Sequence, residues 1–382
     1  MKKLRILITC ETLDGRGGTE LYVRDVALAM LRAGQTPVVY TNRPGAVAAE
    51  IRNMTIPVVE RLDAVGFTPD LIYGQHHLPT MAALLRFPDA PAVYVCHDWY
   101  GVNAFAPNFP RILRFVAVDD ACRDRLVCED GVEESRVRVH TNSVDLARFE
   151  RRPPLPARPR RALVFGNYTG ESPHATALRA ACARHGVQLD VIGEKMNNAV
   201  ADPEAVLKNY DIVFAKGRAA LEALAVGAAV IVYSGVRYLG PMVRAEDVER
   251  LLPLNFGIRA MGDALTPEEL SARVEKELGR YHPEDAAEAS ALVRARAGQA
   301  AATSAILEMC EEVVAEYEQA GGGRDPRGEG TAAAAYLERL GEQLRAQRQS
   351  VQGSAAARLS SRLERYPRLA GVLRPLARAL VR

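Results

Sequence analysis

The segment from residue 210 to 232, YDIVFAKGRAALEALAVGAAVIV, constrains the fold more than any other part of the chain. Its apolar runs 212–215 and 229–232 do not alternate polar and apolar residues, which is typical of buried parallel strands. Between them, 218–226 is rich in alanine and leucine, both strong helix formers, and Gly227 suits a left-handed helix end. The pattern predicts strand, helix and strand, and therefore a parallel sheet covered by helices.

Three charged residues lie near the start of this predicted helix: Lys216, Arg218 and Glu222. In a parallel sheet, ligands bind beyond the carboxyl ends of the strands, where helix N-termini offer free N–H groups and a positive dipole. The position therefore suits a phosphate group. Equally, the two cations could be ordinary solvated loop residues, with Glu222 a surface residue paired with one of them.

Strands and helices alternate along most of the chain, which predicts an α/β protein with two doubly wound sheets. We expect strands of the first sheet at 4–9, 37–41, 70–73, 92–96, 115–118 and 137–140, with a helix over 19–33. The second sheet begins at 162–166, continues at 188–193 and includes the two strands described above. After Thr266 the pattern is helical, and 286–320 is one long segment rich in alanine and glutamate.

Proline and glycine mark the expected boundaries. The stretch RRPPLPARPRR contains four prolines and five arginines, which indicates a linker between domains. Three glycines follow the last predicted helix of the second domain. The predicted divisions are an N-terminal domain over 1–150, the linker over 151–161, a C-terminal domain with a closing helix over 162–320, and a glycine-rich linker with a helical tail over 321–382.

Composition excludes several classes of protein. With 382 residues and 48% hydrophobic content, the chain can bury two cores. The six cysteines form no C-x-x-C pair, which favours reduced thiols in a cytosolic protein over disulfides or a zinc site. No apolar run approaches the roughly 20 residues that span a bilayer, and the N-terminus lacks a signal-peptide pattern. The net charge of +2 gives no general nucleic-acid-binding surface.

The C-terminal tail is basic and amphipathic. From Thr331 onward it has ten arginines, three glutamates and no lysine. From Ser354, apolar side chains recur every three or four residues, with arginines on the opposite face. Such an element suits an anionic membrane surface. It could equally pack on the chain's own domains or make an oligomer contact.

Four motifs occur in an informative order. They are Gly17-Gly18-Thr19-Glu20 after the first strand, His97-Asp98-Trp99 after a later strand, N-S-V-D-L-A-R-F at 142–149, and L-E-A-L-A-x-G-x-x-V-I at 221–231. Each is weak alone, because short glycine and histidine motifs are common. Together, over about residues 3–320, they resemble the GT-B glycosyltransferases, particularly the large family-4 group of retaining enzymes.

This resemblance implies two Rossmann-like domains that face a central cleft, with the acceptor in the first and a nucleotide sugar in the second. It implies a hexosyltransferase-like glycosyltransferase that moves a sugar from a nucleotide-diphosphate donor to a hydroxyl. In the retaining family, a phosphate oxygen of the departing diphosphate takes the acceptor proton. No carboxylate nucleophile is then needed.

The resemblance also implies roles for individual residues. His97, Lys216 and Arg218 are the candidate catalytic residues, since His97 would bond a sugar hydroxyl and the cations would offset leaving-group charge. Glu222 would accept hydrogen bonds from the ribose hydroxyls. Glycines at the first turn let backbone approach a diphosphate or sugar closely. A flexible turn and a structural histidine are the alternatives. The candidate donor-binding residues are Gly17, Gly18, Gly166, Asn167, Lys195, Glu222 and Arg237.

Three departures from the family pattern bear on phosphate binding. Phe214 occupies the position of the first glutamate of the family's pair. The segment 165–170 lacks the two basic residues expected there, and the glycine-rich loop expected at 234–243 lacks its glutamate. Phosphate binding is therefore expected at Lys195, Lys216, Arg218 or Arg237. No Asp-x-Asp occurs, so we expect neither a metal nor another cofactor.

The expected partners are a nucleotide sugar, a glycan or lipid-linked acceptor and, through the tail, an anionic membrane surface, but no nucleic acid. We expect a cytoplasmic protein, peripheral at the inner face of the plasma membrane, that works in bacterial surface polysaccharide or glycan assembly. Two other functions fit the same fold: a catalytically degenerate nucleotide-binding scaffold and a nucleotide-sugar epimerase. The epimerase would need clustered acids and a histidine, which the sequence does not indicate.

Overall fold

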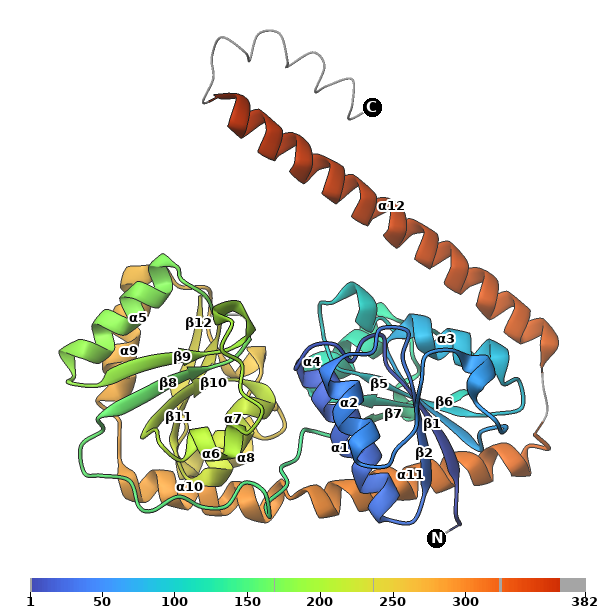
Figure 1. The fold of residues 1–382 in the computed structure, drawn as a ribbon, viewed down its shortest axis with the longest axis horizontal. Coiled ribbons are helices and arrows are strands. Elements are labelled where there is room, and N and C mark those ends of the chain that lie inside the picture. The colour runs from blue at the N-terminus through green and yellow to red at the C-terminus, as the bar shows by residue number, and fades with distance from the viewer. Residues whose placement is uncertain (1, 168, 236, 323–324, 365–382) are drawn as a thin grey trace. The chain divides into compact units, whose positions relative to one another are not determined.

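The computed structural model describes residues 2–167, 169–235, 237–322 and 325–364, with side chains described as far as residue 349 (Figure 1). It divides into two compact units, of which one holds residues 1–106 and 111–323 and the other holds 107–110 and the chain from 324. The predicted amphipathic face from Ser354 onward lies outside the described side chains. Residues 365–382 lie outside the described residues altogether.

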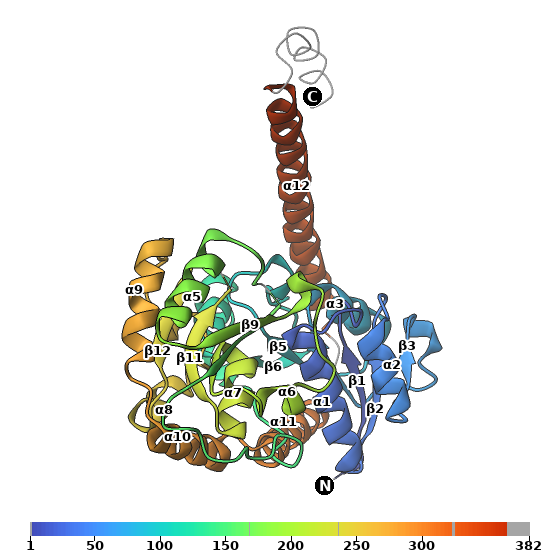
Figure 2. The ribbon, with the colours of Figure 1, turned by 60° about the vertical axis from the view of Figure 1, so that its left-hand side comes forward.

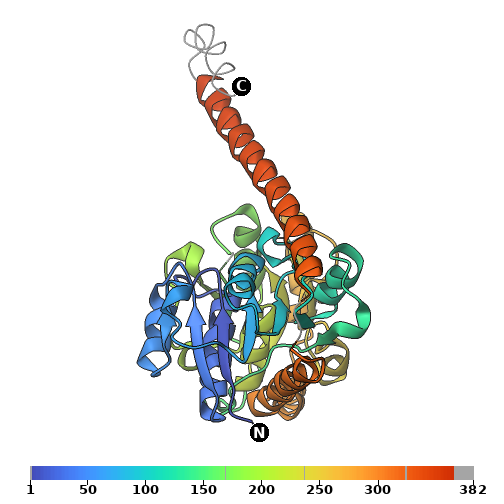
Figure 3. The same cartoon turned by 90° about the vertical axis from the view of Figure 1, so that its right-hand side faces the viewer.

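The first sheet has seven parallel strands in the order β3-β2-β1-β4-β5-β6-β7. Its first strands are the blue arrows in Figure 3. Its strands are β1 Arg5–Thr9, β2 Thr36–Tyr40, β3 Val58–Val59, β4 Leu71–Gln75, β5 Ala92–Cys96, β6 Ile112–Ala117 and β7 Val137–Val139. Its helices and short turns are α1 Gly18–Arg32, α2 Ala46–Asn53, η1 Leu62–Ala64, α3 His77–Arg86, η2 Val102–Ala104, α4 Asp120–Asp124, η3 Arg125–Glu129 and η4 Glu134–Arg136.

The second sheet has five strands in the order β12-β11-β10-β8-β9, parallel except for β12. Figure 2 labels its strands β9, β11 and β12. Its strands are β8 Arg161–Phe165, β9 Gln188–Ile192, β10 Ile212–Ala215, β11 Ala229–Ser234 and β12 Tyr238–Met242. Its helices and turns are α5 Pro173–Arg184, η5 Glu194–Met196, α6 Pro203–Leu207, α7 Gly217–Val226, α8 Ala245–Leu251, η6 Ile258–Ala260, α9 Pro267–Leu278 and α10 Pro283–Arg296. The predicted doubly wound α/β class is confirmed.

Both faces of the second sheet are covered, which explains why its strands read as continuous apolar runs. Val213 and Ala215 of β10 pack into a core shared with α7, α8 and α10. Ile212 and Phe214, whose side chains point to the opposite face, pack into a second core with α5 and α9. Gly227 ends α7 with φ of +91°, as predicted, because this left-handed conformation suits glycine.

The expected glycine-rich loop at 234–243 is wrong, because half of it, Tyr238–Met242, forms the edge strand β12. Leu239 and Met242 are buried in the core, and β12 pairs antiparallel with β11. Gly240 is needed for a close approach, since a Cβ there would lie 2.5 Å from the carbonyl oxygen of Ala260. The glycine that suggested a loop therefore allows backbone to pass a neighbouring turn.

The long helical segment predicted at 286–320 is two helices, α10 and α11 Gln299–Gln319. The chain between them pairs with Val144, whose N–H donates to the Ala297 carbonyl at 2.8 Å and whose carbonyl accepts from Gln299 at 2.9 Å. Beyond this break, α11 contacts α1 and β5. The expected C-terminal domain, 162–320, thus includes a helix that packs with the first sheet.

The second unit contains α12 Pro326–Glu364, a helix of 39 residues that begins before the predicted amphipathic stretch. No helix in the described part of the chain is long and apolar enough to cross a membrane. Five of the six free cysteines are buried, and Cys128 is exposed.

Candidate active site

Each sheet reverses its strand order at one point, and candidate residues lie in the loops at both points. In the first sheet the reversal lies between β1 and β4, so the loops at 10–17 and at His76 meet there. In the second it lies between β8 and β10, where Gly166 and Lys216 follow the strands. Ligands of doubly wound folds bind in the crevice at such points.

The Gly17-Gly18 turn of the first sheet contacts the strand ends of the second. The backbone N–H of Arg16 donates to Oε1 of Glu194 at 2.9 Å. Its carbonyl accepts a hydrogen bond from Nδ2 of Asn167 at 3.1 Å. Two predicted donor-binding positions, Gly17 and Asn167, are therefore brought together. Glu194 was missed, because nothing in its local sequence indicates which turn it contacts.

The surroundings of this turn are acidic. Burial raises the pKa of Glu20, and the nearby carboxylates of Glu194, Asp14 and Glu11 raise it further. Burial also raises the pKa of Glu11. Carboxylates repel phosphate but accept hydrogen bonds from hydroxyls. Of the two ligands expected at Gly17 and Gly18, a sugar suits this environment better than a diphosphate.

His97 follows β5 and lies beneath the surface. Its ring meets the ring of Tyr22 edge to face, with centroids 4.7 Å apart. Among the described residues, no partner bonds its buried Nε2 atom. Burial, together with the nearby His76, lowers the pKa of His97 to about 3. The imidazole is therefore neutral at pH 7 and keeps one polar atom for a ligand hydroxyl.

His76 lies beside the same loop in a left-handed backbone conformation, with φ of +59°. Its Nδ1 atom accepts a hydrogen bond from the N–H of Glu11 at 3.2 Å. Burial lowers the pKa of His76 to about 4. This bond holds the loop after β1 to the end of β4, at the point where the strand order reverses.

Lowering the pH from 6.5 to 5 should reduce the free energy of unfolding. The folded pKa values of His76 and His97 lie below 6.5, the ordinary value, so the unfolded chain binds more protons in this range. Each histidine contributes up to about 1.4 kcal/mol per pH unit. Urea unfolding across this range measures the slope. The double variant H76N/H97N should give a shallower slope, and an unchanged slope would contradict the assignment.

Lys216 is the residue before α7 and follows β10 of the second sheet. Its side chain keeps contact with solvent, yet desolvation lowers its pKa, while the carboxylates of Asp98 and Asp119 oppose this effect. These two aspartates follow β5 and β6 of the first sheet. Lys216 therefore lies where the loops of both sheets meet, one residue before a helix start.

Arg218 and Glu222 form a buried ion pair, not an open phosphate site. Nε of Arg218 donates to Oε1 of Glu222 at 2.7 Å, and its Nη2 donates to Asp25 on α1. The exposed fraction of Glu222 is only 5%. Burial raises the pKa of Glu222, and Arg218 opposes the rise. The alternative interpretation, that Arg218 and Glu222 are solvated surface residues, is wrong, although the expected pairing between them is present.

The ion pairs continue through the first sheet's helices. Asp25 also accepts from Arg24 at 2.7 Å, and Arg24 donates to Glu50 at 3.0 Å. Glu50 in turn accepts from Arg16, next to the Gly17-Gly18 turn. An alternating row of charges thus joins that turn to α7. Its members from α1 and α2 are far from Arg218 in sequence, so no local motif indicates them.

The remaining predicted donor-binding residues lie at the carboxyl edge of the second sheet. Gly166 donates its N–H to Ile192 at 3.0 Å, and the N–H of Lys195 donates to the Asn167 carbonyl at 3.3 Å. Arg237 is exposed in the turn before β12, and its carbonyl accepts from Leu265. Among the described residues, no hydrogen bond or ion pair joins Arg237 to the other candidates.

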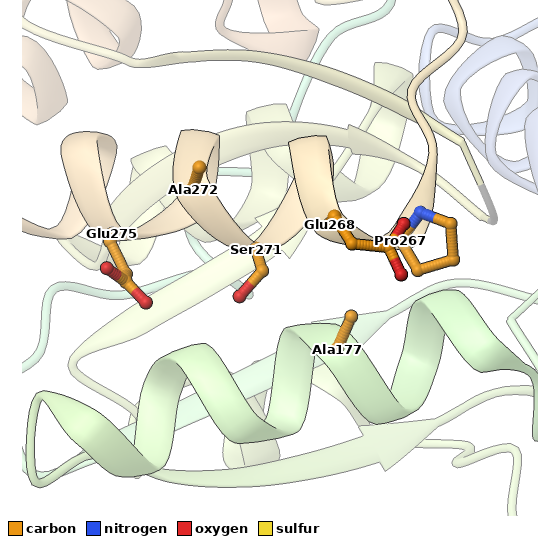
Figure 4. Close-up of a pocket in the computed structure, with 6 residues that line it drawn as sticks. All are labelled: Ala177, Pro267, Glu268, Ser271, Ala272 and Glu275. Carbon is orange, nitrogen blue, oxygen red and sulfur yellow. The ribbon is translucent and has the colours of Figure 1, made fainter.

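A shallow hollow of 410 Å³ lies elsewhere, between α5 and α9 (Figure 4). Its lining includes Ser271 and Glu275, and it uses no loop at a strand end. In the described part of the chain, no group of three or more metal-binding side chains occurs. The switch-point loops are therefore the better candidate for an active site.

Comparisons with known proteins agree with this geometry. Residues 16–148 match the model of Glycosyltransferase Family 4. Among solved structures, the chain is similar to a glycosyltransferase from Rickettsia africae ESF-5, with 14% identity and a TM-score of 0.61 over 82% of this chain and 99% of that one. No curated protein matches the sequence significantly.

Two further structures share the architecture. HepE from Anabaena, in complex with UDP and glucose, is 16% identical, with a TM-score of 0.57 over 81% of this chain and 99% of that one. WaaG, a glycosyltransferase involved in lipopolysaccharide biosynthesis, is 12% identical, with a TM-score of 0.52 over 81% and 99%. At these identities the likeness assigns the fold, which is GT-B.

Proposed function

We propose that this chain, a family-4-like glycosyltransferase of the GT-B fold, transfers a sugar from a nucleotide-diphosphate donor to a hydroxyl of a glycan or lipid-linked acceptor. The observation that carries the proposal is the start of α7. There Lys216 precedes the helix at the switch point of the second sheet, and Glu222 is buried one turn further on. A cation, a helix N-terminus and a carboxylate together match a nucleotide diphosphate.

In this proposal, oppositely charged groups hold the two parts of the donor. Lys216, with the N–H groups of the first turn of α7 that follow Gly217, binds the diphosphate, and Lys195 or Arg237 adds a second cation. Glu222 accepts the ribose hydroxyls. Because Glu222 is already held by Arg218, the ribose shares or displaces part of that pair, while Asp25 keeps Arg218 in place. The acidic Gly17-Gly18 turn and neutral His97 hold sugar hydroxyls.

Transfer proceeds without a carboxylate nucleophile. The bond from the anomeric carbon to the diphosphate oxygen breaks, and its electron pair leaves with the diphosphate, whose charge Lys216 offsets. The acceptor hydroxyl forms the new bond on the same face, and its proton passes to a phosphate oxygen. The configuration is retained. We propose a metal-independent reaction without a cofactor, since the sequence has no Asp-x-Asp.

We propose that the acceptor belongs to bacterial surface polysaccharide or glycan assembly, on the cytoplasmic side of the plasma membrane. The similarity of fold to WaaG supports this setting. The arginine-rich tail would hold the enzyme at the anionic surface. Direct packing of that tail on the chain's own domains is the competing arrangement.

Replacing Glu222 by glutamine should weaken binding of a nucleoside diphosphate by about 1–3 kcal/mol, because the ribose hydroxyls then meet a neutral amide with one acceptor oxygen in place of a charged carboxylate with two. Isothermal titration with UDP, GDP, ADP and dTDP measures this in the native chain and the variant. The matched control is Glu277→Gln, since Glu277 is also buried, accepts from the Met242 N–H and pairs with Arg280. Equal loss in both variants would contradict the ribose assignment.

The same titration, together with an assay of turnover, separates the three candidate functions: transferase, scaffold and epimerase. Binding together with consumption of the corresponding nucleotide sugar and formation of a glycosidic product supports the transferase. Binding without any turnover supports a nucleotide-binding scaffold, and interconversion of epimers without transfer supports an epimerase. If the native chain binds none of the four nucleotides, the proposed donor site is wrong.

A further inference from the structure

The loop after β5 presents aromatic side chains to solvent. The exposed fractions of Trp99 and Tyr100 are 45% and 81%. Their ring centroids are 5.6 Å apart, with an interplanar angle of 51°. Burial of a large aromatic side chain lowers the free energy of the protein. Two adjacent rings that stay exposed give up this stabilisation, which is typical of binding sites.

This loop is held in place from beneath. Nη1 of buried Arg125 donates to the carbonyls of Asp98 and Gly101, each at 2.9 Å. Asp130, also buried, accepts from the N–H of Ala106 at 2.9 Å and lies 3.7 Å from Arg125. Burying the Arg125 guanidinium costs desolvation free energy, but its two hydrogen bonds fix the conformation of the loop backbone. The aromatic pair is therefore presented on a fixed backbone, which lowers the entropy lost on binding.

The conformation at the rings is also constrained locally. The N–H of Tyr100 donates to Oδ1 of Asp98 at 3.0 Å. A Cβ at Gly101 would lie 2.5 Å from Oδ2 of the same carboxylate, so a side chain there would displace Asp98 from this position. Asp98 is exposed and thus sets one polar group beside two apolar ring faces.

The aromatic pair adjoins the proposed active site. His97, with its unpartnered buried nitrogen among the described residues, immediately precedes the loop. The carboxylate of Asp98 acts electrostatically on Lys216, the residue proposed to hold the diphosphate. A ligand that covers the rings would therefore extend from the place where transfer is proposed.

We propose that Trp99 and Tyr100 form a carbohydrate subsite that binds a sugar ring of the acceptor. A pyranose ring has an apolar face of C–H groups, which stacks on aromatic rings, and a rim of hydroxyls, which bond a carboxylate such as Asp98. That this sugar belongs to the acceptor rests on the proposed function. The substrate class that follows is a saccharide acceptor, and not a small hydrophobic alcohol.

A membrane is the competing occupant, because Leu78 and Leu85 on α3 and Val102 are also exposed and α3 contacts the η2 turn. The position of Asp98 favours a sugar. A carboxylate held beside the rings repels an anionic lipid surface, whereas it adds a hydrogen bond to a saccharide.

Trp99 is the only tryptophan in the chain, so its fluorescence reports on this subsite alone. Titrating the full chain with soluble oligosaccharides of α- and β-linked glucose, galactose, mannose and N-acetylglucosamine should shift or quench its emission saturably with at least one of them. Tyr100→Ala should weaken that binding by about tenfold, and Tyr100→Phe should retain it. Leu85→Ala, an exposed residue on α3, should leave it unchanged. A thermal unfolding midpoint equal to that of the native chain shows that each variant folds.

A change in emission with anionic vesicles and none with any saccharide would overturn the proposal in favour of a membrane contact. No change with either probe would overturn it outright. The nucleotide titration keeps the two proposals apart. Nucleotide binding without a saccharide response contradicts only the subsite, whereas a saccharide response without nucleotide binding contradicts the donor site and leaves the subsite in place.

Discussion

Replacing Lys216 by alanine should lower kcat for sugar transfer by about 10²–10³-fold, with a much smaller change in acceptor KM. Lys216 lies at the start of α7, where its charge would oppose the charge that develops on the departing diphosphate. Removing one such preorganised group from an active site typically costs this much. Steady-state kinetics with a nucleotide-sugar donor that the chain turns over measure the effect.

The matched control is Lys208→Ala. Lys208 is in the same half of the chain, but it follows α6 and pairs with Glu150 at 3.2 Å, so no diphosphate role is assigned to it. Its variant should keep nearly all of the activity. Full activity in the Lys216 variant, or an equal loss in both, would remove Lys216 from the proposed mechanism.

Replacing Arg218 by alanine should lower the free energy of unfolding by about 3–5 kcal/mol. The variant leaves Asp25 and Glu222 without their shared cation, and breaking a buried ion pair from one side strands a desolvated charge. Denaturant unfolding at pH 7 measures the loss. Exchanging Glu222 for glutamine as well should recover part of it, because the stranded charge of Glu222 is then absent, whereas Asp25 keeps its ion pair with Arg24.

Arg259→Ala is the comparison for this result. Arg259 likewise joins two aspartates, Asp120 at 2.8 Å and Asp124 at 2.7 Å, but its side chain is exposed. Solvent screens such pairs, so the expected loss is about 1 kcal/mol or less. If the Arg218 and Arg259 variants lose the same stability, burial does not strengthen the Arg218 contacts.

Local patterns predicted the second sheet well where both faces of a strand are covered. The apolar runs predicted the ends of β10 and β11 closely, because a strand that is buried on both faces has a continuous apolar sequence. The β12 strand was missed because Gly240 and Pro241 suggest a turn. Only the approach of Ala260, a contact between distant residues, explains the glycine in a strand.

In the candidate site, too, contacts within one helix could be predicted from the sequence, whereas contacts between distant segments could not. The spacing of Arg218 and Glu222 by four residues already indicates a pair on one helix face. Their third partner, Asp25, and the contact of Glu194 with the Gly17-Gly18 turn depend on how distant segments meet. Such contacts have no signal in a single sequence, because each acid reads locally as a solvated surface residue.

The pairing of Val144 with the segment around Gly298 also bears on how this protein can be divided for experiments. Since α11 returns to pack on α1 and β5, a fragment that stops at residue 150 would lack one of its own covering helices and leave apolar surface uncovered. A contiguous cut at the proline-rich stretch therefore cannot yield the first half intact. A shortened version that keeps this half whole must carry residues 299–319 by a new covalent connection, or receive them as a separately added peptide.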